Sequence, residues 1–365
     1  MNELPLRSFH QGLNARWTEL NGGTAVADYG DVNAEYAALT GAVAWLDLSF
    51  RGRLCVTGAD RVAFLHGLVT NNVKDLKTGE GCYAALVSAK GKMQSDLNIY
   101  RLADELLLDF EPGLAATNLE WLEKYVIAAD AQIVDVGPLY GLLSIQGPQA
   151  EVAMRQLNLG VDLSPKRMSF TTAEGPDGSL YLMNQPRTGA AGFDLFAPAA
   201  ALAGLAERLN GVVAGLGGRA CGWAALETAR IERGIPRFGA DMDATNLPPE
   251  AGLEERAISY NKGCYIGQEV IARIRTYGQV AKSLRGLRLA DDLAKLPVKG
   301  DKLFKQDKEV GFITSAATSP RLNAKLALGY VRREANETGA ELTLRTAEGP
   351  SVARIVPLPF AKNLA

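Results

Sequence analysis

The sequence has few of the residues on which several common kinds of site depend. It contains only two histidines, His10 and His66, and four scattered cysteines without a CxxC pair. Histidine-based catalytic triads and His-rich metal sites are therefore poor explanations, and we expect no disulfide framework, no standard zinc site and no bound metal. This cysteine usage fits a reduced, cytoplasmic setting.

Long apolar runs and an excess of one charge are also missing. No stretch approaches about 18 consecutive apolar residues, so no membrane span is expected. The start of the chain lacks the apolar run behind a basic end that marks a signal peptide. Lys and Arg number 39 and Asp and Glu 41, which gives a net charge of −2. That balance argues against direct nucleic-acid binding, but it leaves room for a local basic pocket for a small anion.

Strand and helix patterns are mixed through most of the chain and predict an α+β fold. Residues 53–60 and 142–149 both read as a strand, a glycine turn and a helix start, which suggests two related α+β units or one common device used twice. Strands are predicted over residues 45–57, 82–88, 93–102 and 106–110. A short helix is predicted to begin near Asp60, and further helices are predicted over 114–128, 199–210 and 219–233.

The last part of the chain changes character. Short strand-like runs recur over 285–360, and turns such as Lys299-Gly300-Asp301 separate them. This pattern predicts a small all-β barrel or sandwich that begins near residue 283.

The densest functional signal is the segment YNKGCYIGQEVIARIR at 260–275. Apolar residues recur there at helical spacing, although part of the run also alternates as a strand would; we favour a helix that begins near Gln268. Cys264 would then lie just before the helix and two residues from Lys262, and both the helix dipole and the ammonium favour a thiolate. Cys264 is therefore a candidate reactive, metal-contacting or redox-sensitive thiol. The alternative is a buried apolar cysteine beside two turn glycines.

Two other segments place charged residues where they could serve a ligand. Arg230 at the end of the helix expected over 219–233 can grip a carboxylate, and Glu232 can accept from a pterin-like amine. A simpler explanation is that a basic residue there complements the helix dipole. Asp96 follows a tight turn on a strand, where it can bind a protonated nitrogen or be an exposed strand residue.

Several motifs, in this order, resemble one known family. They are DLSxRGxLxVTGxD at 47–60, LHGLVTNNVxxL at 65–76, AKGKMxSD at 89–96, IQGP at 145–148, RIERGIPRFGxD at 230–241, LPPEAGL at 247–253 and NKGCYIGQEVIAR at 261–273. Together they resemble the superfamily of the glycine cleavage system T protein, a tetrahydrofolate-dependent aminomethyltransferase. The octapeptide KGCYIGQE resembles the mark of its YgfZ branch.

The resemblance implies a three-domain cloverleaf around a folate channel, with interleaved ferredoxin-like α+β units. The expected domains are an N-terminal α+β folate-binding domain over 1–138, a middle α+β domain with the octapeptide over 139–283, and a small β-barrel over 284–365. The expected cofactor is tetrahydrofolate or a folate derivative. Cys264 is the expected functional thiol, and the expected cofactor-binding residues are Asp96, Arg230, Glu232, Lys262 and Gln268.

The YgfZ resemblance implies an accessory protein that supports assembly or repair of iron–sulfur enzymes, including tRNA-modifying ones. Those client enzymes are its expected partners. The alternative is a tetrahydrofolate-dependent aminomethyltransferase, so the sequence leaves open whether the protein is an enzyme. A tRNA-binding module ranks third because of the net charge of −2.

One segment departs from the T-protein pattern. The T protein usually carries Tyr-Thr-Gly-Glu-x-Gly-(Phe/Val)-Glu in its middle domain, whereas residues 187–194 here read Arg-Thr-Gly-Ala-Ala-Gly-Phe-Asp. The aromatic residue and the first acid, which help to hold the pterin in the T protein, are replaced. Loss of one charged hydrogen bond to a pterin costs about 1.5–3 kcal/mol. The departure weakens the expectation of aminomethyl transfer, whereas Asp96 keeps the acidic position of the T-protein motif.

Overall fold

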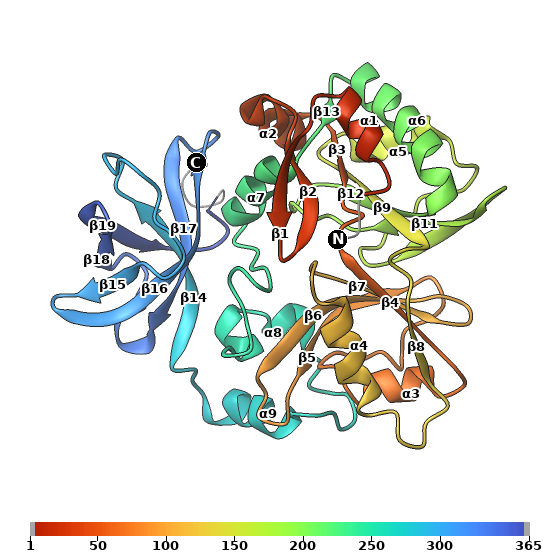
Figure 1. The fold of residues 1–365 in the computed structure, drawn as a ribbon. Helices are drawn as coiled ribbons and strands as arrows, with labels where there is room; N and C mark the ends of the chain where they lie inside the picture. The colour runs from red at the N-terminus through yellow and green to blue at the C-terminus, as the bar shows by residue number, and fades with distance from the viewer. Residues whose placement is uncertain (1–3, 361–365) are drawn as a thin grey trace. The chain divides into compact units, whose positions relative to one another are not determined.

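The structure is a computed structural model that describes residues 4–360 (Figure 1). The chain forms two compact units. The first unit comprises the chain up to Ala84 together with Ser95–Leu226, and the second comprises Ala85–Gln94 together with the chain from Glu227 on. None of the helices in residues 4–360 is long and apolar enough to cross a membrane.

A five-stranded sheet carries the strands predicted in the first third of the chain. Its order is β5-β6-β7-β4-β8. Helix α4 (Ala115–Glu123) packs against β4 and β8. The helix is shorter than predicted, because Tyr125, Val126 and Ile127 are poor helix formers. The strands are β4 (Gly52–Thr57), β5 (Gly81–Val87), β6 (Met93–Arg101), β7 (Leu106–Phe110) and β8 (Gln132–Asp135).

A six-stranded sheet, in the order β10-β11-β12-β9-β3-β13, completes the first unit. Helices α5 (Ala150–Leu157) and α6 (Leu202–Gly215) pack on it and bury a core that includes Trp45 and Leu143. Strand β3 precedes β4 in the chain but pairs with β9, so the two sheets are interleaved as expected. The strands are β3 (Ala44–Asp47), β9 (Tyr140–Gln146), β10 (Phe170–Gly175), β11 (Gly178–Asn184), β12 (Gly192–Pro198) and β13 (Arg219–Ala220).

The strand–glycine–helix echo in the sequence corresponds to the same local structure in both sheets. Strand β4 leads through Gly58 to α3 (Arg61–His66), and β9 leads through Gly147 to α5. Both glycines have a positive φ, +96° and +124°, a backbone conformation that residues with a side chain rarely adopt. Asp60 precedes α3 as predicted, although its side chain makes no capping hydrogen bond to that helix.

The amino-terminal segment adds elements that the sequence did not predict. These are α1 (Arg7–Gly12), the hairpin of β1 (Arg16–Leu20) and β2 (Gly23–Asp28), and α2 (Val32–Gly41). His10 is fully buried, and its imidazole lies 2.8 Å from both the Asp47 carboxylate and the Tyr29 hydroxyl. These polar contacts fasten α1 to β3, so this histidine has a structural role.

Six strands near the carboxyl end form a closed barrel, drawn in blue in Figure 1, in the order β14-β17-β16-β15-β18-β19. Its interior is filled by aliphatic side chains, such as Leu287, Ile313 and Ile355. The α+β prediction with a C-terminal barrel is thus confirmed. The strands are β14 (Lys282–Leu289), β15 (Lys302–Lys305), β16 (Lys308–Ser319), β17 (Ala324–Arg332), β18 (Glu341–Thr346) and β19 (Gly349–Val356).

Short helices lie between the sheets and the barrel in sequence. Helix α7 (Trp223–Glu232) starts later than predicted, because Arg219–Ala220 pairs with β3 and the backbone of Gly222 packs closely against Ala27. Short turns follow at η2 (Pro248–Ala251) and α8 (Glu254–Ala257). The segment that contains KGCYIGQE continues as a helix, α9 (Gln268–Tyr277), which confirms the helix prediction over the strand alternative.

Candidate functional site

The candidate site is built on the five-stranded sheet of the first unit, where charged residues interrupt apolar strands. Asn98 on β6 and Arg53 on β4 are the register partners of Asp109 on β7, so the three side chains share one face. Asp96 lies two residues before Asn98 and therefore on the same face. Asp109 is fully buried, and Arg53 is 1% exposed.

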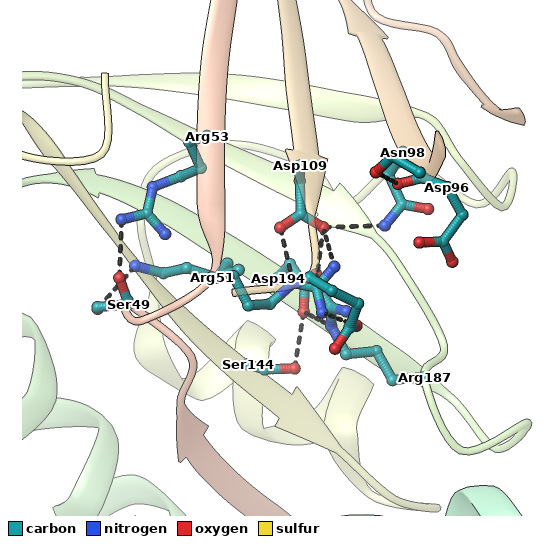
Figure 2. A network of polar contacts seen from close by, with 12 residues as sticks. Ser49, Arg51, Arg53, Asp96, Asn98, Asp109, Ser144, Arg187 and Asp194 are labelled. Atoms are coloured by element: carbon teal, nitrogen blue, oxygen red, sulfur yellow. Dashed lines mark hydrogen bonds and ion pairs between the residues drawn. The ribbon is translucent and has the colours of Figure 1, made fainter. Parts of the chain in front are cut away.

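Asp109 is the most heavily paired carboxylate of this network (Figure 2). Arg51 Nε donates to Asp109 Oδ1 over 2.8 Å, and Asn98 Nδ2 donates to Oδ2 over 2.9 Å. Arg187 Nη2 donates to the same Oδ2 over 3.2 Å. Burial by itself would raise the pKa of Asp109, but the two guanidiniums outweigh it and lower this pKa to about 2. Asp109 therefore stays ionised and holds both arginines.

The six-stranded sheet supplies the other half of the network. Arg187 lies in the loop before β12, and its guanidinium donates to both oxygens of Asp194 on that strand over 2.6–3.1 Å. Ser144 on β9 also donates to Asp194, over 2.7 Å. Arg187 thus joins two buried carboxylates, Asp194 on one sheet and Asp109 on the other.

Asp96 lies at one end of the residues drawn in Figure 2 and differs from its neighbours. The Tyr83 hydroxyl donates to Asp96 Oδ2 over 2.8 Å. Asp96 Oδ1 is buried and has no hydrogen-bond partner among residues 4–360. Burial, reinforced by the negative charge of Glu111, raises the pKa of Asp96 to about 6. A buried acceptor without a partner costs about 1–3 kcal/mol, so this oxygen is suited to a donor supplied by a ligand.

Two other buried groups in this network also lack partners among the described residues. Arg53 Nη2 donates to the carbonyls of Ser49 and Gly137, whereas its Nε and Nη1 have no partner. The Tyr100 hydroxyl is likewise unpartnered, and burial with the charges of Asp194 and Asp109 raises its pKa. Buried polar groups of this kind commonly bind ordered water or a ligand.

The other predicted site residues lie in the second unit. The guanidinium of Arg230 is occupied by Asp241, Glu227 and Ser315, and it is 5% exposed. Glu232 accepts from Ser319 and lies 3.6 Å from an Arg321 nitrogen. Both residues therefore have internal partners that link α7 to the barrel, and their folate-binding roles stay predictions.

The octapeptide segment lies at the start of α9. Cys264 is exposed in the loop before the helix, and the ammonium of Lys262 lies 4.8 Å from the centre of the Tyr265 ring. Gln268 is the first helical residue and is partly buried. Gly267 has a φ of +80°, and a Cβ there would lie 2.5 Å from the carbonyl oxygen of Ser88 and 3.2 Å from the Cα of Gly91. Only glycine fits this approach, so two sequence motifs, AKGKMxSD and KGCYIGQE, meet at this point.

The sequence interpretation missed most of the buried network. Arg51, Asp109, Arg187 and Asp194 had no predicted role as a group. A signal was present, because Asp109 stands inside the apolar run LLLDF and Asp194 inside GFDLF. A charged residue within a buried strand must have a partner, but the sequence does not show which one.

Comparisons with known proteins agree with this architecture. The fold is that of a solved glycine cleavage system aminomethyltransferase T from Bartonella henselae, with a TM-score of 0.87, 24% identity, and coverage of 98% of this chain and 97% of that one. The GCVT N-terminal domain model matches residues 6–262, and the glycine cleavage T-protein C-terminal barrel domain model matches 282–362. The chain therefore belongs to the glycine cleavage T-protein family.

Curated relatives match along their whole length. An aminomethyltransferase from Desulforamulus reducens is 29% identical over 365 residues, which cover 100% of this chain and 99% of the relative. An aminomethyltransferase from Halalkalibacterium halodurans is 27% identical with the same coverage. These comparisons bear out the T-protein superfamily, and the assignment to its YgfZ branch rests on the octapeptide.

Proposed function

We propose that this protein binds a tetrahydrofolate-type cofactor and that Asp96 accepts a hydrogen bond from the pterin. The observation that carries the proposal is the buried, unpartnered Oδ1 of Asp96. A pterin ring presents N–H donors, which complement a carboxylate. Membership of the T-protein family supports this cofactor, because its relatives are named aminomethyltransferases.

The test is a titration of the purified protein with tetrahydrofolate under anaerobic conditions. We expect Asp96→Asn to weaken binding by about 10- to 100-fold, because a charged hydrogen bond to a ligand contributes about 1.5–3 kcal/mol. Asp291→Asn is the matched control, since Asp291 is an exposed aspartate in the second unit. Equal affinities of wild type and Asp96→Asn would exclude Asp96 from the site.

We further propose that the bound folate serves an accessory role in the assembly or repair of iron–sulfur enzymes. The octapeptide around Cys264 supports this role. A second support is Arg187, which stands where the T protein carries an aromatic pterin contact and whose guanidinium is committed to Asp194 and Asp109. Ala190 replaces the first acid of the same motif. Two residues that help to hold the pterin in the T protein are therefore replaced, which weakens the expectation of aminomethyl transfer, while Asp96 keeps the acidic position of the motif.

A second candidate is aminomethyl transfer itself, and the names and full-length match of the relatives favour it. The two candidates are separated by incubating the protein with tetrahydrofolate and an aminomethylated lipoyl carrier. Stoichiometric excess of methylenetetrahydrofolate and ammonia over protein would establish transfer. Absence of product at high protein concentration, with folate binding intact, would leave the accessory role.

The accessory role has its own test in cells. Deletion of the gene should lower the activity of several [4Fe–4S] enzymes, including tRNA-thiolating ones, and the wild-type chain should restore them. Cys264→Ala should fail to do so, whereas Cys82→Ala, which changes a partly buried cysteine outside the octapeptide, should succeed. Full rescue by Cys264→Ala would remove this thiol from the mechanism.

A further inference from the structure

A cavity in the second unit is lined by arginines to which residues 4–360 supply no carboxylate partner. Its volume is about 620 Å³, within the range of small-molecule sites. The lining comes from η2 and α8, from the end of α9 and the residues after it, from β14, and from the segment after β17. Three arginines face it: Arg275, Arg285 and Arg333.

The pairing of these arginines differs from that of other arginines on the barrel. Arg288 and Arg354 lie 3.6 Å and 2.5 Å from the carboxylates of Asp291 and Glu341. Among residues 4–360, no carboxylate lies within ion-pair distance of any of the three cavity arginines. A guanidinium without an internal carboxylate partner can form hydrogen bonds and an ion pair with an anion from solution.

Arg285 is the least exposed of the three. It is partly buried on β14, and its Nε donates to the carbonyl oxygen of Asn336 over 3.4 Å. Its terminal nitrogens have no hydrogen-bond partner among residues 4–360 and can contact a ligand. Burial lowers the pKa of Arg285 from its ordinary value, because it removes water from around the charged guanidinium.

The acidic residues of the lining do not cancel this charge. Glu250 Oε2 accepts from the backbone nitrogen of Leu247 over 3.0 Å. Glu254 accepts from the Tyr260 hydroxyl over 2.9 Å, and the guanidinium of Arg275 stacks 4.1 Å from the centre of the same ring. The stack and the hydrogen bond fix Arg275 at the cavity, and the three arginines exceed the two glutamates by one charge.

We propose that this cavity binds a small molecule through an oxyanion group, a phosphate or a carboxylate, with Arg285 as the central contact. Guanidinium groups suit both because they donate two parallel hydrogen bonds. The apolar part of the lining, which includes Ile274 and Leu284, would contact the stem of such a molecule.

The test is calorimetric titration of the full-length protein with three probes: inorganic phosphate, pyrophosphate and glutarate. We expect saturable binding of at least one probe, and the preferred probe tells whether the natural ligand carries a phosphate or a carboxylate. Arg285→Gln should weaken that binding about tenfold or more, which corresponds to the loss of a charged hydrogen bond. Arg333→Gln changes an exposed residue and should weaken binding of the probe less. This second variant tests the proposal if Arg285→Gln does not fold.

The matched control is Arg288→Gln, on the same strand but outside the cavity. It should bind the probe as wild type does. The proposal is overturned if no probe binds at up to about 10 mM, if neither cavity variant weakens binding, or if Arg288→Gln weakens it as much as they do. Because no probe contains a pterin, this outcome is independent of the folate proposal.

Discussion

Asp109 and Asp96 lie on adjacent strands of one sheet and share one face, yet their carboxyl groups are in opposite electrostatic states. Asp109 receives hydrogen bonds from Arg51, Arg187 and Asn98, and its pKa falls to about 2. The carboxylate of Asp96 accepts from the Tyr83 hydroxyl, its Oδ1 has no partner among residues 4–360, and its pKa rises to about 6. The difference shows that burial alone does not define a ligand site. The informative feature is a buried carboxylate whose partners are incomplete.

The largest effect should come from removing the paired carboxylate. Asp109→Asn deprives Arg51 and Arg187 of a shared negative charge inside the protein, so we expect a loss of about 3–5 kcal/mol in the free energy of unfolding. Urea denaturation measures this loss, provided that the dependence of the free energy of unfolding on urea concentration is the same in both proteins. The exposed pair of Asp291 and Arg288 is the benchmark, and Asp291→Asn should cost less than about 1 kcal/mol. Similar losses in both variants would mean that the buried network does not stabilise the fold.

A smaller effect on the free energy of unfolding is expected at Asp96, where the ionised carboxylate destabilises the folded protein. Its pKa in the folded state, about 6, lies above the ordinary value of 3.8, so the folded protein holds this proton more tightly than the unfolded chain. The stability due to this group is full below about pH 4 and is lost as the pH rises to about 6. In Asp96→Asn this loss should disappear.

The measurement is the free energy of unfolding of both proteins between about pH 4 and pH 8. As the pH rises to about 6, the free energy of unfolding of Asp96→Asn should increase relative to that of wild type, and the difference should stay constant at higher pH. A difference that is constant over the whole range would show that the Asp96 carboxyl titrates normally.

The parts of the fold that follow local patterns could be predicted from the sequence. Strand β7 was predicted at its observed bounds, Leu106–Phe110, because an apolar run is bounded by turn signals. The barrel followed from repeated short strands, and α9 from helical spacing. Domain boundaries at residues 138 and 283 stay predictions.

The candidate site could be predicted only in part, because its partners are distant in sequence. Asp96 was identified from its motif, but Arg51 and Arg187 are 136 positions apart and meet at Asp109 only after two sheets have formed. The folate-binding role expected for Arg230 and the functional role expected for the Cys264 thiol stay predictions. Side-chain pairing of this kind depends on register and sheet order, which periodicity does not encode.

The most direct test of the Asp96 proposal is the proton balance of folate binding. Tetrahydrofolate is titrated into wild type and Asp96→Asn at pH 6 in two buffers with different ionisation enthalpies. A pterin N–H that donates to the carboxylate stabilises its charged form, so wild type should release about half a proton more than the variant. Equal proton release by the two proteins, or a net proton uptake by wild type relative to the variant, would contradict the account.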